Sequence, residues 1–295
     1  MKIQKNVLLK NYTTFRIGGP AEYFCIAKSK EDLIKAINFA QKNKTTFFIL
    51  GGGSNLLVSD NGYNGLVIKI ENCKLKISAR RQAGKICKVI AGAGVTLAKL
   101  VSATANASLS GMEWATGIPG ATVGGAIRGN AGAFGTEMKD ITKTVTVLEI
   151  RNSKFEIRKF NNEDCQFGYR DSIFKKNSNL IILSAELEFK KGDKEEIKNK
   201  VKEILNYRRS SHPKYSSAGS IFKNLENARA RDLIEKASLK GKIIGKAQIS
   251  EQHANFIVNL GGAKAKDVLK LIDLVKKEVK NKFRIEIEEE IQILS

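Results

Sequence analysis

Histidine and cysteine are scarce in this chain. Its 295 residues include two histidines and four cysteines, namely His212, His253, Cys25, Cys73, Cys87 and Cys165. No two cysteines have the Cys-x-x-Cys spacing. Protein zinc sites are built from closely spaced cysteine and histidine ligands. The sequence therefore argues against a zinc site, and we expect no bound metal and scattered, reduced thiols.

Long apolar runs, internal repeats and low-complexity linkers are also missing. No stretch of eighteen or more apolar residues occurs, which argues against a membrane-spanning helix. The first six residues are too polar for a signal peptide. With 42% hydrophobic residues, the chain can bury an ample core, and its length predicts two or three packed domains. We therefore expect a soluble, cytoplasmic protein that has no membrane partner.

The formal charge of +21 makes a nucleic-acid binder one candidate. However, the lysines are spread along the whole chain and mingle with acidic residues, as in residues 191–196. Nucleic-acid surfaces usually cluster basic residues with aromatic ones. We therefore expect no nucleic-acid partner, and a basic RNA-binding protein remains the alternative from a different functional class.

The first segment of the chain reads as strands alternating with a helix. Ser29 can cap a helix whose apolar side chains recur at helical spacing, followed by strands over residues 47–50 and 66–70. A strand over residues 85–91 and Gly92-Ala93-Gly94 then precede a helix capped by Thr96. This order resembles the start of a dinucleotide fingerprint, but Leu97 occupies the third glycine position and Glu113 follows no predicted strand. A Rossmann site is therefore not expected there.

Strands of one antiparallel sheet are predicted over residues 143–150, 154–159 and 180–189. Asp193 with Glu196 resembles a capping box at the start of a helix. Another amphipathic helix carries Val268 through Val279, and a closing strand is predicted over residues 285–294.

Two glycine-rich segments point to a cofactor. The first directly follows a hydrophobic strand and consists of Gly51, Gly52, Gly53, Ser54 and Asn55. Its main-chain amides could hold a pyrophosphate, although a tight turn explains three glycines equally well. The second, residues 117–135, has more small residues than a helix or strand interior would favour. The two together favour a large nucleotide cofactor.

Three further features contain candidate catalytic residues. Arg170 lies between two predicted strands, where its guanidinium could pair with a carboxylate. Ser220 lies among small, flexible neighbours, but no Gly-x-Ser-x-Gly motif and no histidine-aspartate arrangement accompany it, so a serine hydrolase is not expected. Strand alternation would place Glu286, Glu288 and Glu290 on one side of the closing strand and Glu289 on the other.

Taken together, these segments resemble the bacterial UDP-N-acetylenolpyruvoylglucosamine reductases. The resemblance spans nearly the whole chain, through residues 12–21, both glycine segments, Tyr169-Arg170, residues 219–224, residues 253–259 and Glu290-Ile291. It implies an α+β protein: a two-part FAD-binding fold of the vanillyl-alcohol-oxidase type followed by a C-terminal α/β substrate-binding domain. The implied domains are residues 1–70, with the strand 286–295 returning to them, residues 71–208 and residues 209–285.

The family is made up of flavoenzymes in which NADPH reduces FAD, which then reduces the enolpyruvyl group of a UDP-sugar for peptidoglycan synthesis. The resemblance assigns catalytic roles to three residues: Arg170 for charge stabilisation, Ser220 as proton donor and Glu290 as its partner. The implied substrate contacts are Tyr169, Arg208, Lys223, Asn224 and His253. The implied FAD contacts are Gly51, Gly52, Gly53, Ser54, Asn55, Gly117, Ile118, Pro119, Gly120, Gly124, Gly125, Ala126, Asn130, Gly132 and Ala133.

The chain departs from the family pattern at Leu225, where proline usually follows the Lys-Asn pair. Only residues 175–179 separate Phe174 from the next predicted strand, so the resemblance is to the subtype without an extra lid.

The competing interpretation within the fold is another FAD oxidoreductase that acts on a hydroxy acid or sugar. The family resemblance further implies a monomeric enzyme linked to cell-wall formation, cell shape and cell division.

Overall fold

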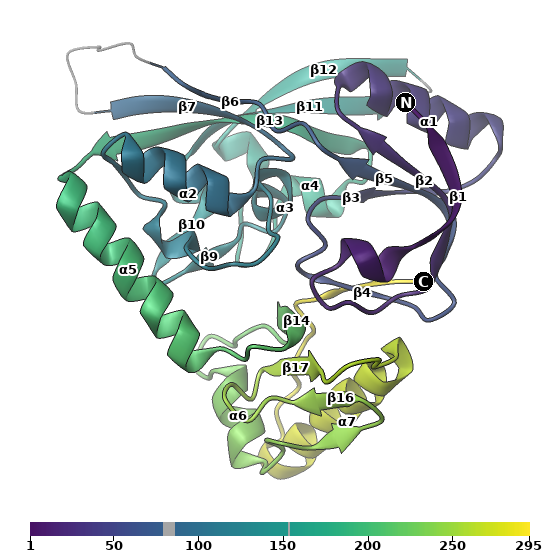
Figure 1. The fold of residues 1–295 in the computed structure, drawn as a ribbon, viewed down its shortest axis with the longest axis vertical. Helices are drawn as coiled ribbons and strands as arrows, with labels where there is room; N and C mark the ends of the chain where they lie inside the picture. Colours follow the sequence, from purple (N-terminus) through teal and green to yellow (C-terminus); the bar gives the residue numbers. More distant parts are fainter. Residues whose placement is uncertain (79–85, 153) are drawn as a thin grey trace. The chain divides into compact units, whose positions relative to one another are not determined.

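The computed structural model describes residues 1–78, 86–152 and 154–295 (Figure 1). The chain groups into two compact units. Unit 1 contains Met1–Lys2, Cys25–Gly52 and Ile68–Tyr207, and unit 2 contains Ile3–Phe24, Gly53–Val67 and Arg208–Ser295. Among the described residues, no helix has the length and apolarity needed to span a membrane, and no cluster of His, Cys, Asp or Glu could hold a metal ion. The four cysteines are free thiols.

The main sheet of unit 1 is antiparallel. Its strands follow the order β12-β11-β13-β7-β6, with β8 (Leu109–Ser110) also pairing with β13. Their bounds are Lys154–Asn161, Thr142–Arg151, Leu180–Lys191, Ile86–Gly92 and Leu75–Ile77. Val145 lies opposite Phe160 on one side and Ala185 on the other. The prediction that three strands over residues 143–150, 154–159 and 180–189 form one antiparallel sheet is confirmed. The strand predicted to start at Lys85 is described from Ile86, because Lys85 lies outside the described residues.

The helices of unit 1 start where the sequence places their caps. Ser29 accepts a hydrogen bond from the amide of Asp32 at the start of α1 (Lys30–Lys42), at 3.2 Å. Thr96 accepts one from the amide of Lys99 in α2 (Leu97–Asn106), also at 3.2 Å. The carboxylate of Asp193 accepts bonds from the first-turn amides of α5 (Lys194–Ser211). Each side chain satisfies an amide that the helix leaves without a partner.

A further sheet has the order β1-β2-β5-β3. Its strands are Ile3–Leu8, Pro20–Ala27, Tyr63–Ile70 and Phe47–Leu50. Strands β2 and β5 each contribute residues to both units. The strands predicted over residues 47–50 and 66–70 are both present, the second beginning three residues earlier than predicted.

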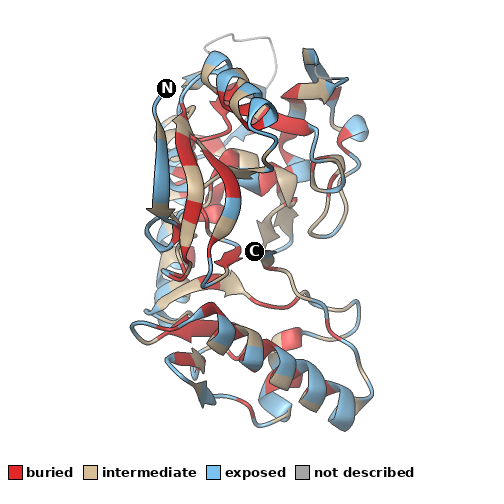
Figure 2. Cartoon of the chain, turned by 90° about the vertical axis from the view of Figure 1, so that its right-hand side faces the viewer, coloured by how far each residue is buried: buried red, intermediate tan, exposed pale blue. Residues whose placement is uncertain are grey.

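Unit 2 is built around a four-stranded antiparallel sheet and a long helix. The sheet order is β14-β17-β16-β15, with strands Ser216–Ser220, Phe256–Asn259, Ala247–Ile249 and Ile243–Ile244. Helix α7 (Ala265–Phe283) buries the predicted face from Val268 to Val279 in the same core as Ile249 and Ile257, and Figure 2 shows its exposed outer face. Helix α6 (Ala230–Lys236) adds to this core, and β18 (Gln292–Leu294) pairs in parallel with β4 (Leu56–Val58).

Two expectations were wrong. The closing strand covers Gln292–Leu294 instead of residues 285–294, and Glu289 forms only an isolated bridge with Phe222. Residues 223–225 have no regular secondary structure, so they do not extend this bridge into a ladder. The second glycine segment does contain a helix, α3 (Val123–Arg128). Glycine is needed at position 124 of this helix because a Cβ there would lie only 2.8 Å from the Cβ of Ala93.

Candidate cofactor and active site

The two glycine segments meet in unit 1 through their main chains. A Cβ added to Gly52 would overlap the carbonyl oxygen of Gly120. One added to Gly51 would lie 2.7 Å from Oγ1 of Thr122. No side chain fits between these loops, so Gly51 and Gly52 present main chain where the sequence predicts a pyrophosphate site.

Thr122 is a residue that the sequence analysis missed. Its side chain is only 6% exposed, and its hydroxyl has no hydrogen-bond partner within the described part of the chain. Burial of a hydroxyl without a partner is unfavourable, so this group is suited to a ligand that brings an acceptor. The available signal was a hydroxyl residue directly before Val123 in the glycine segment. The loops and this hydroxyl fit the pyrophosphate of a flavin nucleotide.

The remaining part of the second segment is braced by Asn130. Its amide donates to Glu137 Oε2 at 3.0 Å and to the carbonyl oxygen of Gly168 at 2.9 Å. Its oxygen accepts from the amide of Lys139 at 3.0 Å. The side chain is fully buried, and three protein groups use it. Asn130 thus fixes the glycine segment next to the chain that leads into Tyr169, and any contribution to FAD binding remains a proposal.

Arg170 is held against the glycine segment. Its Nη2 donates to the carbonyl oxygen of Gly132 at 2.9 Å, and its guanidinium lies 5.0 Å from the ring centroid of Tyr169. Its φ of +55° places an arginine in the left-handed region. Such strained residues persist where the surrounding structure fixes them and are common at functional sites. The two predicted residues Tyr169 and Arg170 are therefore presented together beside Gly132.

Unit 2 brings Ser220, Glu290 and Asn55 into neighbouring positions. Ser220 ends β14, and the carbonyl oxygen of the next residue, Ile221, accepts a hydrogen bond from the amide of Glu290 at 2.7 Å. The carbonyl oxygen of Glu290 accepts one from Asn55 Nδ2 at 3.0 Å. The buried side chain of Asn255 holds Phe222 at both its amide and its carbonyl, at 2.9 and 2.8 Å. Segments far apart in sequence thus fix the end of β14.

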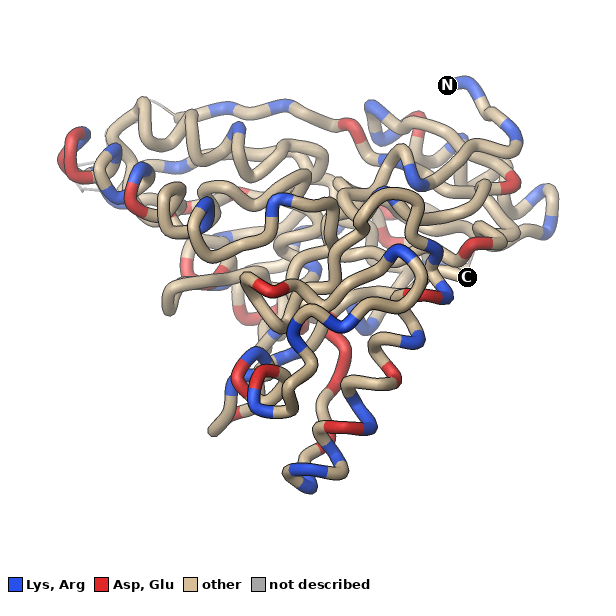
Figure 3. The backbone as a smooth tube through the Cα atoms, turned by 60° about the horizontal axis from the view of Figure 1, so that its bottom comes forward, with Lys and Arg blue, Asp and Glu red and all other residues tan. Residues whose placement is uncertain are grey.

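The four glutamates near the C-terminus differ in their surroundings. Glu286, Glu288 and Glu289 form ion pairs with Lys280, Lys223 and Lys276 at 2.7, 2.9 and 3.0 Å. Figure 3 shows basic and acidic residues interspersed along the chain in this way. Glu290 lies beside the end of β14, where its main chain bonds to Ile221 and to Asn55. The ion pairs also place Lys223, a predicted substrate contact, against Glu288 in this structure.

The other predicted substrate contacts have structural neighbours. Asn224 Oδ1 accepts from the amide of Ala230 at the start of α6, at 3.1 Å. The carbonyl oxygen of Arg208 accepts from the amide of His212 at 2.9 Å. The rings of His212 and His253 lie 5.6 Å apart, and both contact Phe256. Burial, reinforced by nearby arginine charge, lowers the pKa of both histidines from 6.5 to about 4.

This histidine pair predicts a loss of stability in mild acid. Because the folded-state pKa lies below the unfolded value, the unfolded chain binds more protons between pH 6.5 and about 4. The contribution of the pair is therefore complete above pH 6.5 and disappears as the pH falls toward 4. We expect the midpoint of urea unfolding to fall over this window, and to fall less in the double variant His212→Gln, His253→Gln. Equal slopes for the two proteins would contradict this assignment.

Comparisons with known proteins identify the family. Residues 21–158 match the FAD binding domain family, and residues 212–294 match the C-terminal domain of UDP-N-acetylenolpyruvoylglucosamine reductase. The enzyme of that name from Clostridium novyi is 40% identical over 99% of this chain and 92% of its own length. The one from Alkaliphilus oremlandii is 43% identical over 97% and 91%.

A solved structure extends the agreement to the fold. The crystal structure of the reductase from Thermus caldophilus matches with a TM-score of 0.80 and 36% identity, covering 100% of both chains. The α+β class, with an FAD-binding part followed by a C-terminal domain, is confirmed. The resemblance inferred from the sequence motifs is confirmed as well: this chain belongs to the UDP-N-acetylenolpyruvoylglucosamine reductase family.

Proposed function

We propose that this chain reduces the enolpyruvyl group of UDP-N-acetylglucosamine enolpyruvate to give UDP-N-acetylmuramate, a peptidoglycan precursor, with NADPH as reductant and FAD as cofactor. Family membership over the whole chain supports this reaction. The structural observation that supports FAD binding most directly is the close approach of the two glycine segments beside the buried hydroxyl of Thr122, which has no hydrogen-bond partner among the described residues. When bound, FAD supplies the two-electron chemistry between NADPH and C3 of the enolpyruvyl group.

The cofactor would be held by residues 51–55 and by the second glycine segment. Main-chain amides and the Thr122 hydroxyl suit a pyrophosphate because they offer donors without a side chain that blocks close approach. The close packing of Gly52 on Gly120 would keep the two loops at a fixed spacing. The proposed FAD contacts are those assigned by the family resemblance, with Thr122 added.

The protein's catalytic task is to control charge and deliver a proton. Addition at C3 of an enol ether that carries a carboxylate builds enolate character at C2. Arg170, fixed by Gly132 and Tyr169, would stabilise the carboxylate and the developing charge. Ser220 would donate its proton to C2, which is plausible for a weak acid because an enolate-like carbon is a strong base. Glu290 would assist Ser220 from its position beside the end of β14.

Glu290→Gln is expected to lower the rate of flavin reoxidation by the sugar nucleotide about tenfold or more, because a neutral amide supports proton delivery less well. Glu286→Gln is the matched control, since Glu286 is exposed and pairs with Lys280, which has no proposed role. It should change that rate less than about twofold, because an exposed ion pair contributes little. Stopped-flow absorbance of the flavin measures both. A larger effect for Glu286→Gln than for Glu290→Gln would contradict the assignment of Glu290.

The remaining features of the proposal follow from the family. Tyr169, Arg208, Lys223, Asn224 and His253 would contact the sugar nucleotide, and Lys223 would exchange Glu288 for a substrate phosphate. The enzyme would act in the cytoplasm as a monomer, without a nucleic-acid or membrane partner. Its product would serve cell-wall formation and thereby cell shape and division. The three-domain division, with a substrate domain over residues 209–285, belongs to the same proposal.

Product analysis tests the reaction itself. The purified protein is incubated in D₂O with NADPH and UDP-N-acetylglucosamine enolpyruvate, and the sugar nucleotide is examined by mass spectrometry and NMR. We expect UDP-N-acetylmuramate with solvent deuterium at C2. An unchanged sugar nucleotide, together with oxidation of a hydroxy acid or sugar, would favour the other FAD oxidoreductase. A protein that takes up no FAD and retains RNA in a salt-sensitive manner would favour the RNA-binding alternative.

A further inference from the structure

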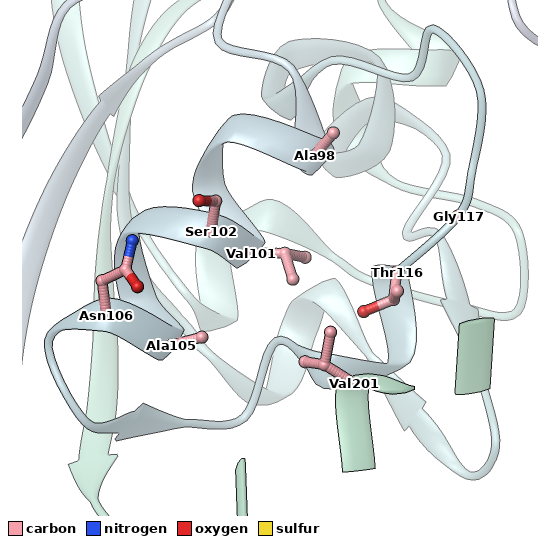
Figure 4. Close-up of a pocket in the computed structure, with 8 residues that line it drawn as sticks. All are labelled: Ala98, Val101, Ser102, Ala105, Asn106, Thr116, Gly117 and Val201. Carbon is pink, nitrogen blue, oxygen red and sulfur yellow. The ribbon is translucent and has the colours of Figure 1, made fainter. Parts of the chain in front are cut away.

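A pocket of about 310 Å³ lies in unit 1 between α2 and α5 (Figure 4). Helix α2 contributes Ala98, Val101, Ser102 and Ala105 to its lining, and Val201 of α5 contributes from another side. These α2 positions lie three or four residues apart, so they share one helix face. Their side chains are small, which leaves space between the helices. No charged side chain lines the pocket.

Thr116 supplies an independent indication of a ligand. This side chain is only 7% exposed, and its hydroxyl finds no hydrogen-bond partner in the described residues. Figure 4 shows the hydroxyl directed into the pocket. A buried hydroxyl without a partner is unfavourable, and an occupant with a hydrogen-bonding group would remove that cost.

The lining defines the chemical class of the occupant. The volume is at the lower end of the range for small-molecule sites, and the mixture of apolar walls with a few polar groups is typical of them. The lack of charged groups disfavours phosphates, carboxylates and cations. The occupant should therefore be small and uncharged, with an apolar body and one hydrogen-bonding group.

We propose that this pocket binds a small uncharged molecule whose apolar body lies between α2 and α5 and whose hydroxyl or carbonyl group bonds to Thr116. Gly117 also lines the pocket and begins the second glycine segment. An occupant therefore touches the first residue of the loop that is proposed to hold FAD. This coupling to the flavin rests on the proposed function, whereas binding at Thr116 does not.

Benzyl alcohol is the probe, and toluene is its matched analogue without the hydroxyl. Binding to the FAD-loaded protein is measured by ligand-observed NMR titration. Thr116→Val should weaken benzyl alcohol about five- to tenfold, the effect of one hydrogen bond, and leave toluene unchanged. Ala98→Leu should abolish binding of both because it fills the space. Ala103→Leu, on α2 but outside the lining, should affect neither.

Binding that follows this pattern would establish the site whatever the catalytic activity of the protein. A change in the flavin absorbance on saturation with benzyl alcohol would add support for the coupling through Gly117. Failure of the wild-type protein to bind benzyl alcohol, or equal binding by Ala98→Leu, would overturn the proposal. Competition between benzyl alcohol and FAD for the apoprotein would also overturn it, because the pocket would then be part of the cofactor site.

Discussion

Replacement of Ser220 by alanine is expected to slow flavin reoxidation by the sugar nucleotide about 10²- to 10⁴-fold, the usual contribution of a general acid. Flavin reduction by NADPH should remain largely intact, because that half-reaction requires no proton at C2 of the sugar nucleotide. Anaerobic stopped-flow absorbance separates the two half-reactions. The expected result is therefore a flavin that bleaches at a normal rate and recovers very slowly.

Ser216→Ala is the matched control for this experiment. Ser216 begins the strand that Ser220 ends, and it lies opposite Asn259 in the sheet, so the two changes affect β14 in similar ways. The control should retain both half-reactions. Equal losses of both half-reactions in Ser220→Ala, or an equally slow recovery in Ser216→Ala, would remove the basis for a proton-donor role.

Gly52→Ala is expected to lower FAD binding at least tenfold and to lower the melting temperature. The new methyl group would overlap the carbonyl oxygen of Gly120, which belongs to backbone and cannot rotate away. Overpacking of this kind costs about 1–3 kcal/mol, and the shift would change the spacing of the two loops that are proposed to hold the pyrophosphate. The FAD-to-protein absorbance ratio and thermal unfolding with and without added FAD measure these effects.

Gly129→Ala is the appropriate comparison because it adds the same methyl group in the second glycine segment. Its φ is −98°, and its nearest neighbour would be the carbonyl oxygen of Gly125 at an ordinary 3.7 Å. It should bind FAD as the wild type does. If Gly52→Ala bound FAD normally while Gly129→Ala did not, the close approach of the two loops would not explain cofactor binding.

Local sequence signals predicted much of the fold. The caps at Ser29, Thr96 and Asp193 were correct because each bonds to an amide two or three residues away. The three long strands of the unit 1 sheet and the buried face of α7 were also predicted, since each has a clear two-residue or helical period. The motifs around the glycine segments, Arg170 and Ser220 were enough to indicate the family, which the comparisons confirm.

The errors arose where distant segments decide the structure. Alternation predicted a strand over residues 285–294, but a strand requires a partner, and Glu289 forms only an isolated bridge with Phe222. No local pattern shows that Lys223 pairs with Glu288, 65 residues away. Similarly, the buried hydroxyls of Thr116 and Thr122 become notable only once the fold has left them without partners. Such non-local features could therefore be identified only from the structure.

In the proposed function, one chain carries out both halves of a flavin-dependent reduction. The most direct test is the visible spectrum of the FAD-loaded protein without oxygen, recorded after addition of NADPH and then of UDP-N-acetylglucosamine enolpyruvate. We expect NADPH to bleach the flavin and the sugar nucleotide to restore its colour. A flavin that NADPH reduces but the sugar nucleotide cannot reoxidise would show that this chain does not reduce the enolpyruvyl group.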